Sequence, residues 1–157
     1  MVKSSRHSKI TGDFAEHLVL YWLSKYGFEC ARVDHTGIDL IARKPHTNEV
    51  MGISVKGRSR GEGTAGTYVS IPRGNFDKVK KACKAFNCVP YFAIVVDQND
   101  EIFIFILSME KLLTMFPLGK AVSGWKMTKK WIDRYIADPE IQIIRFEHKT
   151  LRWWEIT

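Results

Sequence analysis

The sequence predicts a single-domain protein of the α/β class with a central mixed sheet flanked by helices. The chain has 157 residues, of which 45% are apolar, so it is long enough for one hydrophobic core and too short for two ordinary domains. Segments with helical spacing of apolar residues alternate with short apolar segments bounded by turn residues. Their order is one helix, three strands, a second helix and further strands, which indicates helices packed on a sheet.

The first predicted helix extends from Phe14 to Tyr26, because its apolar residues recur at spacings of three and four. Segment 11–13 (Thr-Gly-Asp) offers N-capping chemistry, and Gly27 favours the end of the helix. Residues 1–10 are polar and basic. We therefore expect them to form a flexible arm that precedes a domain over 11–157.

Three predicted strands follow the first helix, separated by turns rich in glycine, proline and asparagine. A glycine-rich loop and a short strand lead to a second helix, which we expect Asn75 to cap. Two strongly apolar strands come next, and their continuous hydrophobicity indicates burial on both faces. The expected elements are strands 30–33, 38–42 and 50–56, loop 58–66, strand 68–71, helix 75–86, strands 91–96 and 102–107, a helix capped by Ser108 and ending at 115, helix 129–137 and strand 141–146.

The charge balance favours a polyanionic partner. There are 24 Lys and Arg residues against 17 Asp and Glu residues, a formal net charge of +7. No apolar segment approaches the roughly 20 residues that span a bilayer, and the first residues lack the apolar stretch of a secretory signal. The cysteines are odd in number and the histidines are scattered, so neither a disulfide framework nor a zinc site is expected. The expected location is the cytoplasm, with no membrane partner.

Four polar residues occupy positions where apolar side chains would be usual. Glu16 lies in the first helix, and Asp39 starts an apolar strand. Ser54 and Lys56 alternate with apolar residues on the third strand and so share one of its faces. If the second and third strands form a hairpin, Asp39 approaches that face.

An acid beside a lysine on a strand can bind a divalent cation and a phosphate together. Asp39 would hold the cation through oxygen, and Glu16 would complete its surroundings directly or through water. Lys56 would orient or deprotonate the attacking water, or neutralise charge that develops on the phosphate.

The segment 37–56, with Gly-Ile-Asp followed by Ser-Val-Lys, together with the helical Glu16, resembles the PD-(D/E)xK nuclease superfamily. Its layout is most similar to that of archaeal Holliday-junction-resolvase-like nucleases, over about residues 11–96. The resemblance implies the restriction-endonuclease-like fold with its αβββαβ core, here within about 11–107, followed by an extension over 108–157. It also implies a Mg²⁺-dependent DNA endonuclease, with Mn²⁺ as a substitute ion. By position, Asp39 matches the invariant acid, Lys56 the lysine and Glu16 the helical acid, and the Val55 carbonyl is a backbone metal ligand.

The sequence departs from the superfamily pattern at two places. Gly37 and Ile38 precede the acid where a proline is nominal, and Ser54 replaces the usual Glu or Gln of the third motif. A hydroxyl is a weaker ligand than a carboxylate, so another acid is expected to compensate. The candidates are Glu62 in the glycine-rich loop and Asp77 in the second helix, or Glu16 acting alone.

Basic residues are concentrated around the proposed site. Segment 53–81 has seven cations against two acids, and segment 120–134 has five against one. The residues expected to bind backbone phosphates are Lys3, Arg6, Lys9, Arg58, Arg60 and Arg73. The tryptophans at 125, 131, 153 and 154 either stack on unpaired bases or close a core or an interface.

The leading prediction is a metal-dependent DNA endonuclease, and a homodimer is expected because two nicks in opposite strands need two sites. The alternative is a non-catalytic nucleic-acid-binding module on the same fold, whose metal site has decayed through Ser54. A third hypothesis is a protein-interaction domain that uses the tryptophans of segment 120–157. Branched DNA, a duplex site and RNA all stay open as substrates.

Overall fold

A six-stranded mixed sheet forms the centre of the protein, in the order β1-β2-β3-β5-β6-β8. The computed structural model describes residues 2–154. Only β3 and β5 pair in parallel, and the other neighbours in this sheet are antiparallel. The strands are β1 (Glu29–His35), β2 (Ile38–Arg43), β3 (Val50–Ser59), β5 (Val89–Gln98), β6 (Glu101–Ser108) and β8 (Gln142–Glu147).

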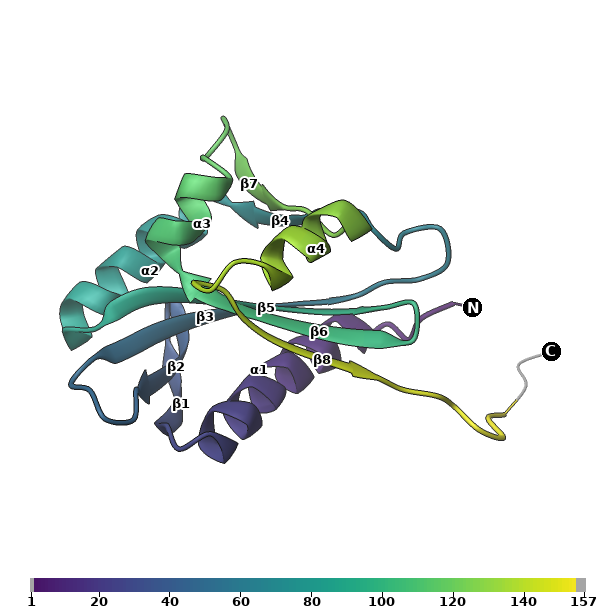
Figure 1. The fold of residues 1–157 in the computed structure, drawn as a ribbon, viewed down its shortest axis with the longest axis horizontal. Helices are drawn as coiled ribbons and strands as arrows, with labels where there is room; N and C mark the ends of the chain where they lie inside the picture. The colour runs from purple at the N-terminus through teal and green to yellow at the C-terminus, as the bar shows by residue number, and fades with distance from the viewer. Residues whose placement is uncertain (1, 155–157) are drawn as a thin grey trace.

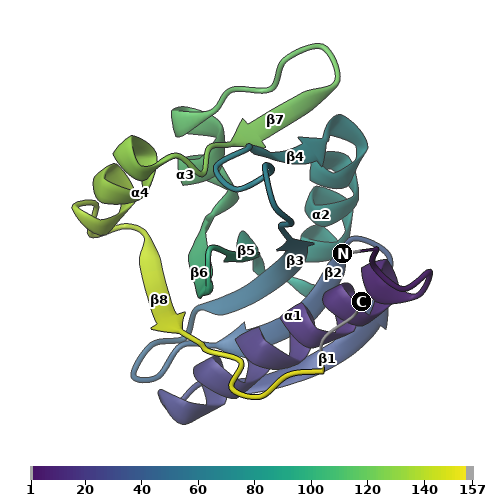
Figure 2. The same cartoon turned by 90° about the vertical axis from the view of Figure 1, so that its right-hand side faces the viewer.

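Helices cover both faces of this sheet (Figures 1 and 2). One face packs against α1 (His7–Lys25), which presents Ala15, Val19 and Leu23 at a spacing of four residues. The other face carries α2 (Arg73–Phe86), α3 (Met109–Met115), α4 (Lys129–Ile136) and a small antiparallel sheet of β4 (Val69–Pro72) and β7 (Val122–Trp125). The sheet therefore separates two hydrophobic cores.

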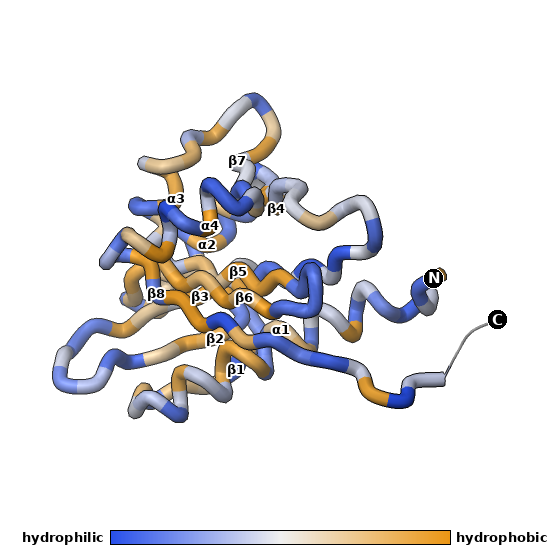
Figure 3. The backbone as a smooth tube through the Cα atoms, turned by 45° about the vertical axis from the view of Figure 1, so that its right-hand side comes forward, coloured by the Kyte–Doolittle hydropathy of each residue, from blue (hydrophilic) through white to orange (hydrophobic). Residues whose placement is uncertain are grey.

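The apolar strands lie in the middle of the molecule, with the hydrophilic segments at its edges (Figure 3). Residues 92–96 of β5 and 102–107 of β6 are all buried, which confirms the two-sided burial expected from their continuous hydrophobicity. Strand β3 and strand β5 are joined through β4 and α2, the long connection that a parallel pair requires. The expected α/β class with a mixed, helix-flanked sheet is confirmed.

The first helix begins earlier than expected. Helix α1 already includes His7, so the flexible arm predicted over residues 1–10 is wrong for its last four residues, and 11–13 lie inside the helix. Two contacts within the helix support this start: the Thr11 hydroxyl donates to the His7 carbonyl at 2.7 Å, and Lys9 pairs with Asp13 at 3.1 Å. Polar residues at suitable spacing extend a helix without any apolar signal.

Two other local predictions need correction. Pro72, not Asn75, occupies the N-cap position of α2, and Asn75 lies inside the helix. Strand β7 was not expected, because its four residues, Val-Ser-Gly-Trp, become a strand only by pairing with β4. The Ser108 cap is confirmed, since its hydroxyl accepts from the Lys111 N–H at 3.1 Å.

The segment after residue 107 packs on the rest of the chain rather than standing apart. Strand β8 extends the main sheet beyond β6, and β7 pairs with β4. Residues 155–157 of the predicted domain lie outside the described residues. Among residues 2–154, no helix is both long enough and apolar enough to cross a membrane.

Candidate active site

The candidate site lies where β2 and β3 separate. These strands pair from Arg43 with Val50 to Leu40 with Ile53, whereas β3 continues along β5 as far as Ser59. Beyond Ile53, the edge of β3 that faces β2 has lost its backbone partner. There the Asp39 side chain takes over, and its Oδ2 accepts the Val55 N–H at 2.6 Å. We call this place, where Asp39 of β2 contacts Val55 of β3, the fork.

The fork collects oxygen atoms on one edge of β3. The N–H and C=O of one strand residue point to the same edge of the strand. Because the Val55 N–H points to Asp39, the Val55 carbonyl lies on that side as well. The Asp39 carboxylate and the Val55 carbonyl thus lie on the same edge of β3, and their joint role as metal ligands stays a prediction.

Lys56 reaches the opposite side of β3 from the α1 core. Ser54 and Lys56 pair in register with Phe92 and Ile94, whose side chains belong to the core on the α2 side. The Lys56 Nζ donates to Asn75 Oδ1 at 3.0 Å, and both residues are half-buried. The asparagine that the sequence suggested as a helix cap therefore fixes the proposed catalytic lysine instead.

Glu16 of α1 lies close enough to the fork for its charge to act on Asp39. The Arg32 guanidinium is bound to the Glu16 carboxylate. Arg32 of β1 donates to Glu16 Oε2 through Nη2 at 2.7 Å and through Nε at 3.2 Å. Its Nη1 also lies 3.4 Å from His17 Nε2. The sequence carries no local signal for Arg32, because this contact joins α1 to a strand residue sixteen positions further along the chain.

Burial shifts the pKa values of Asp39 and Lys56. It raises the pKa of the Asp39 carboxyl; the Val55 N–H opposes this rise, while the nearby charge of Glu16 adds to it. Burial likewise lowers the pKa of the Lys56 ammonium, against the attraction of Asp39. Both shifts mean that the two charged forms cost free energy here, as is common at functional sites.

Ser54 contributes no acid and is nearly fully buried, with 2% of its surface exposed. The two acids suggested as substitutes, Glu62 and Asp77, are both exposed. Among residues 2–154, no group of three or more His, Cys, Asp or Glu residues is placed to hold a metal ion. Neither substitute therefore joins Asp39 and Glu16 in this structure.

The donors that are present still suit a hard cation. Asp39, Glu16 and the Val55 carbonyl offer oxygen atoms, which are the ligands that Mg²⁺ and Mn²⁺ prefer. The carboxylate count is low for such a site, since Glu16 is the one acid whose charge is seen to act on Asp39 among the described residues.

Several cations predicted to bind phosphate have partners within the protein. Arg58 and Arg60 donate to the carbonyls of Ser70 and Tyr68, at 3.3 and 3.0 Å, and so fasten β4 to the end of β3. The other contacts involve Lys3 with Ser59, Lys9 with Asp13 and Arg73 with Gly119, while Arg6 is exposed. Phosphate binding by these residues stays a prediction.

The tryptophans differ in burial. Trp125 is fully buried and stacks on Tyr135, with ring centroids 4.0 Å apart, so it belongs to the core. Trp131 is half-buried between Lys126 and Arg134. Trp153 and Trp154 are 61% and 80% exposed beyond β8.

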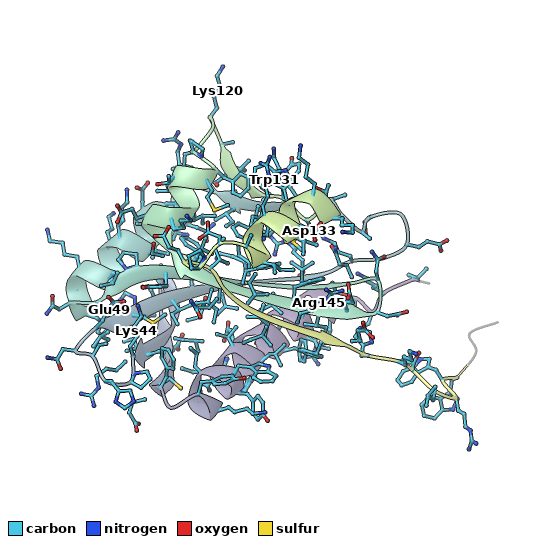
Figure 4. All side chains as sticks on the ribbon, in the orientation of Figure 1. Lys44, Glu49, Lys120, Trp131, Asp133 and Arg145 are labelled. Atoms are coloured by element: carbon cyan, nitrogen blue, oxygen red, sulfur yellow. The ribbon has the colours of Figure 1, made fainter. Side chains whose placement is uncertain are left out.

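A cavity of about 710 Å³ lies elsewhere, at the end of the sheet where Lys44 and Glu49 meet (Figure 4). None of the fork residues lines it. Part of its polar lining is paired: Lys44 lies 2.7 Å from Glu49, and the Tyr91 hydroxyl contacts both side chains at 2.8 and 2.9 Å. The buried Nε1 of Trp22, which also lines the cavity, has no hydrogen-bond partner among residues 2–154.

The architecture is that of the restriction-endonuclease-like fold. One similar solved structure is the Holliday junction resolvase Hjc of Archaeoglobus fulgidus, with a TM-score of 0.55 and 16% identity over 78% of this chain and 88% of that one. Another is the bacterial homing endonuclease I-Ssp6803I, with a TM-score of 0.50 and 12% identity over 78% of each chain. Neither family models nor curated proteins match the sequence. At these identities the likeness establishes the fold, which the sequence had predicted.

Proposed function

We propose that the protein is a metal-dependent endonuclease that hydrolyses phosphodiester bonds in DNA. The observation that carries this proposal is the fork itself. There the Asp39 carboxylate of β2 accepts the Val55 N–H of β3, and Lys56 follows Val55 on β3. Two proteins with this fold are described as a Holliday junction resolvase and a homing endonuclease, which supports DNA as the substrate.

Each residue of the fork has a distinct task in this proposal. Asp39, Glu16 and the Val55 carbonyl would hold Mg²⁺, which when bound supplies positive charge and lowers the pKa of water. Burial lowers the pKa of Lys56, so it releases a proton more readily than a free lysine. As an ammonium it also stabilises negative charge that develops on the phosphate. Asn75 holds this ammonium in one direction.

A cleavage assay tests the proposal directly. Linear duplex, single-stranded, forked and four-way-junction DNA would be incubated with Mg²⁺ or Mn²⁺ and separated on gels. We expect Lys56→Ala to lower the cleavage rate on the order of 10²–10⁴-fold, the usual effect of removing a group that takes part in proton transfer. Asp39→Ala should lower it at least as much, because the variant loses a carboxylate that would hold the metal ion. Lys129→Ala removes an exposed charge of α4, away from the fork, and should cut like the wild type. Full activity of either fork variant would refute the assignment.

The substrate that is cut fastest would define the biological class. Preference for the four-way junction indicates a resolvase-like role, and preference for the duplex indicates a restriction-like or homing-like one. Cutting both strands of either substrate needs two sites, so the proposal includes a cytoplasmic homodimer. Sedimentation equilibrium measures this, and a monomer at all concentrations would restrict the protein to nicking.

A second candidate function is supported by Ser54 and Arg32. The third motif lacks its acid, and a guanidinium occupies Glu16, so the same fold could serve as a DNA-binding module without cleavage. This candidate predicts salt-dependent DNA binding in every lane and no metal-dependent product. Ser54→Glu restores a carboxylate beside Lys56, and new cleavage by this variant would identify the serine as the cause.

A further inference from the structure

The contact between Arg32 and Glu16 places a cation of the protein where the proposed function needs a metal ion. Two N–H groups of the guanidinium converge on Glu16 Oε2. The His17 ring lies beside the third nitrogen, and its Nδ1 is 2.8 Å from the Asp13 carbonyl. A neutral imidazole with its proton on Nδ1 satisfies both contacts, so it accepts from Arg32 and helps to hold the guanidinium over Glu16.

Cations surround the two acids of the fork. The charges of Arg32 and Lys56 act on Asp39, and those of Arg58 and Lys78 act on Lys56. Ser54 adds no third carboxylate, although an acid is usual at that position of the motif. The affinity of an oxygen site for a divalent cation follows its negative charge, so this site attracts a cation weakly without help.

The Arg32 side chain can leave Glu16. It is 42% exposed, and Glu16 is 23% exposed, so the ion pair lies at the surface, where such pairs are weak. A released guanidinium presents a planar pair of donors that matches a phosphate. A DNA backbone at the fork would at the same time bring the negative charge that the site lacks.

We propose that Arg32 couples metal binding to DNA binding, by neutralising Glu16 in the free protein and turning to a backbone phosphate once a cation has taken Glu16. The inference rests on the proposed function, because it takes Glu16 as a metal ligand. Coupling between two ligands is reciprocal, so each ligand raises the affinity of the other by the same factor.

Binding measurements test this without any need for catalysis. Calorimetry would follow Ca²⁺, which prefers the same oxygen ligands as Mg²⁺, binding to the free protein and to its complex with a short duplex. Gels would confirm that the duplex stays intact, and thermal unfolding that each variant is folded. For the wild type, we expect Ca²⁺ to bind on the order of tenfold more tightly when DNA is present, a typical size for such coupling.

Removal of the guanidinium should change both halves of this result. With Arg32→Gln, we expect the affinity of the free protein for Ca²⁺ to rise on the order of tenfold and the effect of DNA to shrink by the same factor. Arg32→Lys keeps the charge without the planar donors and should lie between the two, which also covers a folding defect of the glutamine variant. Lys129→Gln breaks an exposed ion pair of α4 and should behave as the wild type.

The outcomes separate the two proposals. Suppose that the wild type binds Ca²⁺ and that the DNA-free Arg32→Gln variant binds Ca²⁺ no more tightly than the DNA-free wild type. The coupling role of Arg32 is then overturned, and the proposed function stands. If neither the wild type nor the Arg32 variants bind Ca²⁺, with or without DNA, both the metal-dependent function and the role of Arg32 are overturned. If Asp39→Ala abolishes Ca²⁺ binding while Arg32→Gln strengthens it, both are supported.

Discussion

The close approach of α1 to β3 at Gly57 yields a prediction whose sign the structure determines. A Cβ atom at this position would lie 2.8 Å from the Ala15 Cβ and 3.1 Å from the Thr11 carbonyl oxygen. Carbon atoms in contact normally stay about 3.5–4.0 Å apart, so Gly57→Ala must push the helix roughly 1 Å away from the strand. Ala15 has 1% of its surface exposed and cannot rotate aside.

Overpacking of this kind costs about 1–3 kcal/mol of the free energy of unfolding. We expect a loss of about 2 kcal/mol for Gly57→Ala, which lowers the melting temperature of a domain of this size by about 4–8 °C. The same displacement separates the two sides of the fork, since Glu16 follows Ala15 and Lys56 precedes Gly57. A shift near 1 Å can reduce catalysis about 10²-fold, so the variant should cleave poorly even where it is folded.

Urea unfolding followed by circular dichroism measures the loss, and Gly12→Ala is the matched control. Gly12 lies in the same helix, and an alanine Cβ at this position would meet no neighbouring element within 4 Å. Because alanine favours helices over glycine, this variant should gain about 0.5–1 kcal/mol in the free energy of unfolding. The reasoning is refuted if Gly57→Ala unfolds within about 0.5 kcal/mol of the wild type, the usual range of neutral surface substitutions. It is equally refuted if Gly12→Ala loses as much as Gly57→Ala.

Three further predictions concern the fork and the core. Because burial raises the folded-state pKa of Asp39, stability falls as the pH rises from its usual 3.8 through the raised value; Asp39→Asn should therefore unfold at higher urea than the wild type at pH 7, and a lower midpoint would contradict this. Asn75→Asp places a negative charge 3.0 Å from Lys56 and should raise its pKa and move the alkaline limb of the cleavage profile upward, whereas an unchanged profile would exclude Lys56 as the titrating group. Tyr135→Phe loses the hydrogen bond to the Lys126 carbonyl and should cost about 1 kcal/mol in thermal unfolding, with unaltered DNA binding as its control.

The position of Asp39 shows how stability and proposed function oppose each other here. Its carboxylate replaces a backbone partner at the point where two strands separate, and burial makes its charge costly. Such a group persists only where the surrounding structure holds it, and polar groups of this kind gather at functional sites. In the sequence, Asp39 is visible as a polar residue between the apolar residues Ile38 and Leu40.

The local patterns of the sequence determined most of the secondary structure and part of the site. Alternation along β3 placed Ser54 and Lys56 on one face, because the side-chain period of a strand is two. The apolar spacing of α1 identified its buried side, although polar residues extended it to His7. These features depend on neighbours within a few residues, and such neighbours are visible in a sequence.

Only the tertiary structure decided how the fork is completed. Asp39 reaches the Val55 N–H because β2 and β3 stop pairing after Ile53, and the sequence has no signal for where a ladder ends. The partners of Glu16 and Lys56, which are Arg32 and Asn75, lie 16 and 19 residues away along the chain. Contacts of this kind arise from the packing of whole elements, so they follow from the register of the sheet and the seating of its helices and not from local spacing.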